Sequence, residues 1–318
     1  SKPLRADTSM RHMIKEILRY YYRKCYQKFQ YENFKTNMLL GKQLAESNAT
    51  KERIADLDEV TFQVFSQRGE DGVLQYLLSK IAVPHKLFIE FGVEDYTESN
   101  TRFLLMNNDW RGLVLDGNRR NIRFIQSDFI YWKYDITACQ AFITAENINE
   151  LIGRYTDCAD IGLLSIDIDG NDYWVWNAID VINPRIVVCE YNSAFGDTLP
   201  VSVPYDPRFE KTKAHYSQLY YGCSLAALCY LAGCKGYDFV GTTSAGVNAY
   251  FVRKDLSAPF KTYTAQTGFH ESANRDSRHP DGALSFLPHG ERLKQIADLK
   301  LVDVTNGTLS AIQELYGL

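Results

Sequence analysis

Short apolar runs, each followed by a glycine or an acidic residue, recur along this chain. The first covers residues 87–91 and leads into Gly92, and the second covers residues 112–115 and ends at Asp116. Short runs of this kind are typical of strands buried on both faces, and the segment between them predicts a helix. Two parallel strands joined by a helix place Gly92 and Asp116 side by side at the carboxyl edge of a sheet. The pair therefore predicts a nucleotide pocket.

The same pattern continues downstream. Further apolar runs predict more strands of the same sheet, over residues 131–136, 161–168, 185–190, 237–241 and 248–253. The last two runs are separated only by the short link 242–246, as in an antiparallel hairpin. We therefore expect an α/β, Rossmann-like, doubly wound fold, with a mostly parallel seven-stranded sheet that ends in an antiparallel C-terminal hairpin.

Three regions follow from this pattern. Residues 1–52 predict a helical region, residues 53–255 the Rossmann-like domain, and residues 256–318 a C-terminal extension packed on it. The first region is rich in aromatic residues and carries nine basic against three acidic side chains between Ser1 and Lys35, a net charge of +6. Such a helix packs on its own domain, pairs with a second copy to form a homo-oligomer, or lies on the inner face of a membrane.

Composition narrows the class of protein. The chain is 45% hydrophobic with a net charge of −4, which gives no general attraction to nucleic acid. No run is long enough to span a membrane, and we see no signal peptide. The seven cysteines have no zinc-like spacing and predict reduced core thiols. We expect a cytoplasmic protein.

The turn after the first strand predicts which nucleotide binds. Gly92 lets the backbone approach a ligand, and Asp116 can accept both ribose hydroxyls of an adenosine. Glu94 and Asp95 stand where a pyrophosphate site needs glycines, and their charges would repel a diphosphate. S-adenosylmethionine, which has an adenosine and no phosphate, fits better. The alternative is that Gly92 only ends a strand and Asp116 only caps a helix.

Other polar residues predict the remaining contacts of this cofactor. Ser66 and Gln67 precede the first strand and could bind its amino-acid part, and Asn100 lies at a helix start that suits its carboxylate. Asp135, at the end of the expected third strand, could accept from the adenine amino group. The alternatives are a helix cap for the first pair and a turn aspartate for Asp135.

A third group of acids predicts the reactive centre. Asp167 and Asp169 leave the strand over residues 161–168, and Glu190 and Asn192 leave the next one. Paired carboxylates are costly unless a cation or a proton lies between them. Asp169, Glu190 and Asn192 are oxygen ligands of the kind that Mg²⁺ or Mn²⁺ takes. The alternative is that Glu190 pairs with an arginine and that Asp172 caps the following helix.

The long loop over residues 193–221 alternates aromatic and polar residues, which suits a sugar. His215 lies within it and is a candidate base. A lone loop histidine without a catalytic role is the alternative.

In their order along the chain, several motifs resemble a known family. They are Phe65 to Gly72, Phe88 to Val93, Gly112 to Gly117, Ile166 to Tyr173 and Gly236 to Arg253. This order resembles the FkbM-like group of class I S-adenosylmethionine-dependent methyltransferases, and part of it is similar to the macrocin O-methyltransferases, which methylate sugars with a bound magnesium.

The resemblance implies roles for particular residues. It implies that Glu90, Gly92 and Asp116 hold the cofactor, with Asp135 near adenine. It also implies a metal ligand or base at Asp169 and a second metal ligand at Glu190. The chain departs from the pattern in its glycine-poor loop and in having Glu190-Tyr191 where the macrocin group has two acids.

These features together predict methyl transfer to a hydroxyl of a sugar or glycan. Either a metal lowers the pKa of that hydroxyl or a base takes its proton, with Asp167, Asp169 and His215 as candidates. Two other functions stay open: an NAD-dependent or nucleotide-sugar enzyme, and an inactive module that binds a partner.

Overall fold

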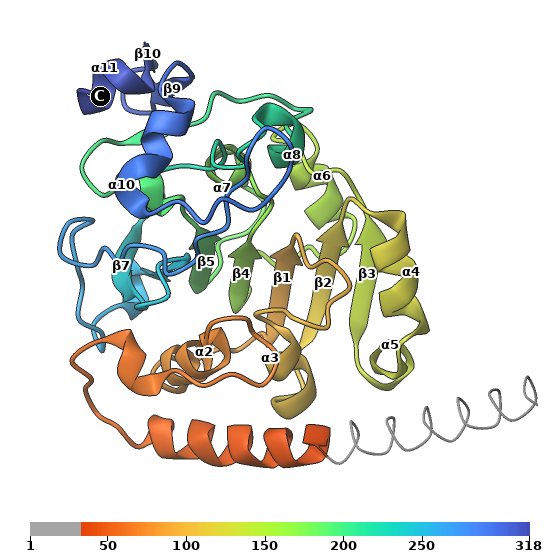
Figure 1. Ribbon diagram of the computed structural model, residues 1–318. Helices are drawn as coiled ribbons and strands as arrows, with labels where there is room; N and C mark the ends of the chain where they lie inside the picture. Colours follow the sequence, from red (N-terminus) through yellow and green to blue (C-terminus); the bar gives the residue numbers. More distant parts are fainter. Residues whose placement is uncertain (1–32) are drawn as a thin grey trace, which may run out of the picture.

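A seven-stranded sheet forms the centre of the computed structural model, which describes residues 33–318 (Figure 1). Its strands are β1 (Leu87–Phe91), β2 (Arg111–Asp116), β3 (Ile136–Gln140), β4 (Leu163–Ile166), β5 (Ile186–Glu190), β7 (Tyr237–Thr242) and β8 (Asn248–Arg253). In space they follow the order β3-β2-β1-β4-β5-β8-β7. β1 to β5 pair in parallel, and β8 is antiparallel to both neighbours. The predicted fold class is confirmed.

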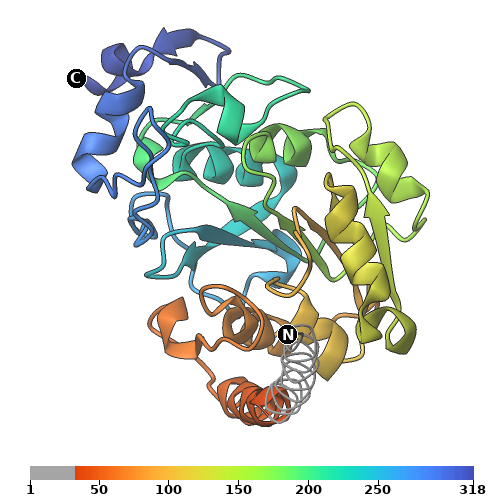
Figure 2. The same cartoon turned by 45° about the vertical axis from the view of Figure 1, so that its right-hand side comes forward.

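Helices cover both faces of this sheet. On one face lie α2 (Glu70–Ser79), α3 (Arg102–Asn107), α4 (Arg119–Ser127) and α5 (Phe129–Lys133). On the other lie α6 (Ile148–Gly153), α7 (Asp172–Ala178) and α9 (Leu225–Lys235). Figure 2 shows α4 lying along β3. Successive strand residues point to opposite faces, so Ile89 packs toward α6, α7 and α9 while Phe88 packs toward α2 and α3. Both faces are therefore apolar, as the continuous runs predicted.

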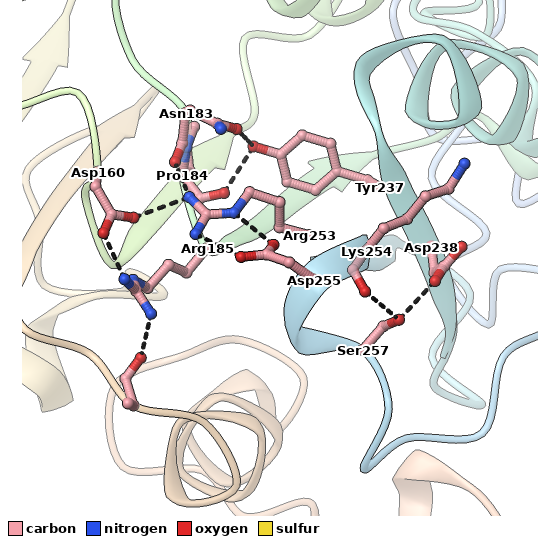
Figure 3. Close-up of polar contacts among 11 residues, drawn as sticks. Asp160, Asn183, Pro184, Arg185, Tyr237, Asp238, Arg253, Lys254, Asp255 and Ser257 are labelled. Carbon is pink, nitrogen blue, oxygen red and sulfur yellow. Dashed lines mark hydrogen bonds and ion pairs between the residues drawn. The ribbon is translucent and has the colours of Figure 1, made fainter.

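The amino edge of the sheet is held by paired charges (Figure 3). Arg253, at the end of β8, contacts Asp160 at 2.8 Å and Asp255 at 2.8 Å, and Arg185 pairs with Asp160 from the other side. The Tyr237 hydroxyl donates to the carbonyl of Pro184 at 2.6 Å. Asp160 and Asp255 at this edge thus have arginine partners.

A smaller sheet lies beyond the carboxyl ends of the strands (Figure 1). Its strands are β6 (Val201–Ser202), β9 (Lys300–Asp303) and β10 (Leu309–Ala311). β6 belongs to the segment after β5 and β9 to the C-terminal extension, so their pairing joins the two segments. They share a core of Phe195, Val201, Val203, Leu219, Ile296, Leu301 and Ile312. This unit also contains α10 (His289–Arg292) and α11 (Ile312–Tyr316), whereas α8 (Lys211–Ala214) belongs to the segment between β6 and α9.

Short 3-10 turns complete the described chain: η1 (Leu57–Val60), η2 (Ser193–Phe195), η3 (Lys254–Leu256) and η4 (Leu293–Ile296). Near the start of the described residues, a helix over residues 33–49 packs on the domain through Ala45, beside Phe62 and Phe103. Most of the basic, aromatic helix predicted for the N-terminal region falls on residues 1–32, outside the described residues, so its partner stays a prediction. Within residues 33–318, no helix has the length and apolar character needed to cross a membrane.

The prediction of a third strand over residues 131–136 is wrong. Asp128 accepts a hydrogen bond from the N–H of Ile130 at 3.3 Å and so caps α5, which takes up the aromatic run. β3 begins only at Ile136. Asp135 therefore precedes β3 and lies at the amino edge of the sheet, away from the carboxyl edge where we predicted it.

Candidate active site

A cavity of about 560 Å³ opens at the carboxyl edge of the sheet, between the strand ends and the smaller unit above them. Many residues predicted from the sequence line it: Gln67, Glu90, Gly92, Asn100, Asp116, Asp167, Asp169, Glu190 and Asn192. They come together because the parallel strands end in register. Phe91 of β1 lies opposite Leu115 of β2 and opposite Ile166 of β4, so the residues that follow each strand share one edge.

The turn at Gly92 is shaped by the neighbouring strand. Gly92 has a φ of 72°, and a Cβ there would lie 1.5 Å from the carbonyl oxygen of Asp167. A glycine is therefore required because the backbone of the next strand comes so close. We had expected the close approach to be that of a ligand. The turn continues through Glu94 and Tyr96, which also have positive φ values, of 47° and 64°.

Asp116 projects from the end of β2 at the wall of the cavity and is 8% exposed. Its Oδ2 accepts from the N–H of Glu94 at 2.9 Å, and its Oδ1 accepts from the N–H of Asn118 at 2.7 Å and from Asn121 Nδ2 at 3.2 Å. Asn118, in turn, caps α4 by accepting from the N–H of Arg120. The carboxylate is thus held in one orientation, and Oδ2, which accepts only one hydrogen bond, retains accepting capacity for a ligand hydroxyl.

Glu90 accepts hydrogen bonds from the loop before α3. Its Oε1 accepts from the N–H of Asn100 at 2.9 Å, and its Oε2 accepts from the hydroxyl and the N–H of Thr101 at 2.5 and 3.2 Å. Burial raises the pKa of this carboxyl to about 7. Asn100 Nδ2 also donates to Ser165 Oγ at 3.1 Å. Glu90 therefore positions one wall of the cavity.

Three carboxyls form what we call the acidic cluster: Asp167, Asp169 and Glu190. Each offers an oxygen within 4.8 Å of the others. Burial and then the charge of Asp169 raise the pKa of Asp167, and burial and then the charge of Asp167 raise the pKa of Glu190. Oε2 of Glu190 is buried without a hydrogen-bond partner among the described residues. β4 ends at Ile166, so the first two acids meet through a turn instead of sharing one face of a strand.

A lysine reaches this cluster from α8. Nζ of Lys211 lies 2.5 Å from Oδ1 of Asp169 and 3.8 Å from the ring centroid of Tyr221. Burial alone would lower the pKa of Lys211, but the negative charges of Glu190 and Asp169 raise it. The ammonium is therefore firmly protonated. We had considered an arginine as the partner of Glu190; the structure instead places a lysine near it, and this lysine forms its ion pair with Asp169.

Two neighbours of the cluster have structural roles. Asn192 Nδ2 donates to the carbonyls of Leu219 and Tyr221, both at 3.0 Å, and its Oδ1 accepts from the N–H of Ala194 at 3.1 Å. Both ends of its amide are bound to backbone, so the side chain orders the chain after β5, and its assignment as a metal ligand stays a prediction. The carboxylate of Asp172 accepts two backbone N–H groups of the preceding turn, at 2.8 and 2.9 Å.

Three predicted residues lie outside the cavity. Asp135 lies at the opposite edge of the sheet, so its assignment to adenine is wrong. Ser66 is fully buried, and its Oγ accepts from the N–H of Asp71 at 3.0 Å, so it orders the turn before α2 instead of facing a ligand. Nδ1 of His215 contacts Ser217 Oγ at 2.8 Å and its ring packs on Tyr216, away from the acidic cluster, which corrects its assignment as the base.

The cavity residues that prediction from the sequence missed include Phe142, Lys211 and Arg292. Phe142 follows β3 and is half exposed at the end of that strand; correct placement of β3 would have found it. Arg292 comes from α10 in the C-terminal extension, is buried, and donates to the carbonyls of Leu287 and Asn274. No feature of the sequence predicts that residues 211 and 292 lie near the strand ends.

Comparison with known proteins finds structural likeness only. No protein-family model matches this sequence, and no curated protein matches it. The solved structures most like it include the N-terminal domain of EvdMO1 with S-adenosylhomocysteine bound, at 12% identity and a TM-score of 0.35 over 52% of this chain and 72% of that one.

Human N-acetylserotonin methyltransferase in complex with S-adenosylmethionine is similar at 13% identity and a TM-score of 0.33, over 53% of this chain and 47% of that one. Precorrin-6y C5,15-methyltransferase from Geobacter metallireducens is similar at 16% identity and a TM-score of 0.34, over 63% of this chain and 95% of that one. Likenesses this slight carry no functional assignment, so the function has to follow from the cavity itself.

Proposed function

We propose that this protein is an S-adenosylmethionine-dependent O-methyltransferase that acts on a hydroxyl of a sugar or glycan. The observation that carries the proposal is the position of Asp116. Its carboxylate lies at the end of β2, beside the turn at Gly92, in the wall of the cavity. A carboxylate at this point suits the two ribose hydroxyls of an adenosine.

The surrounding residues favour an adenosine without phosphates. Glu94 and Glu98 line the cavity next to the turn, and Asp95 lies between them in the chain. Burial and the charges of Asp95 and Asp116 raise the pKa of Glu94, a sign that negative charge is already concentrated here. A pyrophosphate would add to this repulsion, whereas the positive sulfonium and amino groups of S-adenosylmethionine would reduce it.

The end of β3 supplies an apolar wall. Phe142 and Ile143 line the cavity near Gly117, which follows Asp116. An adenine ring joined to a ribose on Asp116 would reach these side chains, and aromatic contact with a base is favourable. These residues replace Asp135 as our candidates for the adenine site.

The acidic cluster supports transfer to a hydroxyl. When bound, S-adenosylmethionine supplies an activated methyl group on its sulfonium. The chain must then take the proton of the accepting hydroxyl, and Asp167 and Glu190 are carboxyls that can accept it. Alignment of the hydroxyl with the methyl group contributes up to roughly 7 to 11 kcal/mol to such a reaction.

The opposite wall of the cavity suits a polyhydroxylated acceptor. Phe209 and Tyr221 provide aromatic faces, and Gln218, Asn274 and Arg292 provide polar groups. Sugars bind to such combinations of stacking surface and hydrogen-bonding groups, which is why we favour a sugar or glycan.

Calorimetric titration with S-adenosylhomocysteine tests the proposal, with NAD as the comparison ligand. We expect micromolar binding of S-adenosylhomocysteine and no binding of NAD. Binding of NAD alone would indicate a dinucleotide enzyme. Binding of neither would contradict the proposal and favour the partner-binding module.

A further inference from the structure

Lys211 places an ammonium group inside the acidic cluster. Its Nζ lies 2.5 Å from Oδ1 of Asp169 and 3.8 Å from the centroid of the Tyr221 ring, and its charge also acts on Asp167 and Glu190. We propose that this ammonium is the resident counter-cation of the acidic cluster and that the centre works without a divalent metal.

The segment that carries Lys211 is docked on the turn that carries the acids. Asn171 Nδ2 donates to the carbonyl of Asp206 at 2.8 Å. Phe209 lies so close to Gly170 that a Cβ on this glycine would be 2.2 Å from its ring. α8 begins two residues later, at Lys211 itself. The lysine is therefore anchored at its base by the same turn whose carboxylate it contacts.

The cluster fits a lysine better than a divalent metal. Mg²⁺ and Mn²⁺ need oxygen ligands, and the amide of Asn192 is bound to backbone at both ends. One oxygen of Asp169 is already in contact with the ammonium. A divalent ion within bonding distance of Asp169 would lie next to this positive charge and be repelled by it. The ammonium can therefore balance part of the negative charge of these three carboxyls where a metal otherwise would.

Lys211 also has a role in methyl transfer. This role rests on the proposed function. As the acceptor oxygen bonds to the methyl carbon, the carbon–sulfur bond breaks and its electron pair stays on sulfur. The hydroxyl proton passes to a carboxylate of the cluster, Asp167 or Glu190. Lys211 keeps its proton and stabilises the negative charge that develops on the acceptor oxygen.

Binding of Mn²⁺, followed by the electron paramagnetic resonance signal of the free ion, tests the inference in the full chain. We expect no site for Mn²⁺ at the cluster in the wild-type protein. Lys211→Gln should bind Mn²⁺ about tenfold or more tightly than wild type, because its carboxylates lose their cation. The double variant Lys211→Gln, Asp169→Asn should lose this gain. If Lys211→Gln unfolds, Lys211→Met, which keeps the length of the stem, takes its place.

Two control variants distinguish the effect of the positive charge of Lys211 from a general disturbance of α8. Lys211→Arg keeps the positive charge and should exclude Mn²⁺ like wild type. Lys213→Gln removes an exposed lysine of α8 that pairs with Glu210, and should also behave like wild type. Micromolar Mn²⁺ binding by wild type, or no gain in a folded Lys211→Gln, would overturn the inference, as would a gain in either control.

Titration of the same samples with S-adenosylhomocysteine keeps the two proposals distinguishable. If the expected differences in Mn²⁺ binding are not found but S-adenosylhomocysteine still binds, only the proposed role of Lys211 is contradicted. The expected Mn²⁺ pattern without any S-adenosylhomocysteine binding supports the counter-cation and contradicts the proposed function.

Discussion

The backbone N–H of Glu94 donates a hydrogen bond of 2.9 Å to Oδ2 of Asp116. This bond joins the turn after β1 to the end of β2, two points that are 22 residues apart in the chain. It fixes the carboxylate at the cavity wall and satisfies a backbone donor of a turn with unusual φ angles. Asp116 therefore has a structural role in the turn in addition to the ligand role that we propose for it.

Asp116→Ala should weaken binding of S-adenosylhomocysteine by more than about tenfold, because the ribose hydroxyls lose a charged acceptor. Calorimetric titration measures the change. Asp135→Ala is the matched control, since this aspartate lies at the opposite edge of the sheet, and its affinity should equal that of wild type. Unchanged affinity in Asp116→Ala would remove the ribose assignment.

Gly92→Ala should destabilise the fold far more than Gly236→Ala. Both glycines have positive φ, 72° and 82°, so both substitutions carry the cost of a left-handed alanine, roughly 1–2 kcal/mol. Only at Gly92 does the added Cβ meet another atom, the Asp167 carbonyl oxygen at 1.5 Å, whereas nothing lies within 4 Å at Gly236. Thermal or urea unfolding of the two variants isolates this clash. Equal losses would show that the ends of β1 and β4 are farther apart than described.

Phe142→Ala should weaken S-adenosylhomocysteine binding by about fivefold or more, since contact of an aromatic ring with a base contributes roughly 1–3 kcal/mol. The melting temperature should change little, because this side chain is half exposed. Phe124→Ala removes a similarly exposed phenylalanine on α4, outside the cavity, and serves as the control. A loss of affinity common to both variants would speak against an adenine contact at Phe142.

The stability of the fold should depend on pH through Asp71. Its Oδ2 accepts from the N–H groups of Val64, Phe65 and Ser66, yet burial raises its pKa from 3.8 to about 6. The folded state thus holds this proton more tightly than the unfolded state. Its contribution to stability is fully present below pH 3.8 and is lost as the pH rises to about 6.

Asp71→Asn cannot titrate, so its free energy of unfolding relative to wild type should rise by on the order of 3 kcal/mol between these two pH values. Urea unfolding at a series of pH values measures this difference. Asp281→Asn, at an exposed position of the C-terminal extension, should follow wild type throughout. A difference that stays constant with pH would show that the pKa of Asp71 is the same in the folded and unfolded states.

The hydrophobic pattern of the sequence was enough to predict much of the sheet. The runs over residues 87–91, 112–115 and 185–190 are apolar on both faces, and parallel strands with covered faces produce this signature. The acids that follow such strands must meet at one edge, which is why Asp116, Asp167 and Glu190 could be placed together. The strand predicted over residues 131–136 was wrong because aromatic residues suit strands and helices alike, and the cap at Asp128 favours a helix.

The order of the strands along the chain, the hairpin and the acids at the carboxyl edge could thus be predicted from the residues, because these features depend on local periodicity and on the geometry of parallel strands. Which groups face those acids depends on tertiary contacts. Lys211 arrives on a loop docked through Asn171 and Phe209, and Arg292 arrives on the C-terminal extension through the pairing of β9 with β6. Such contacts between distant segments depend on the packing of whole surfaces, which no local pattern encodes.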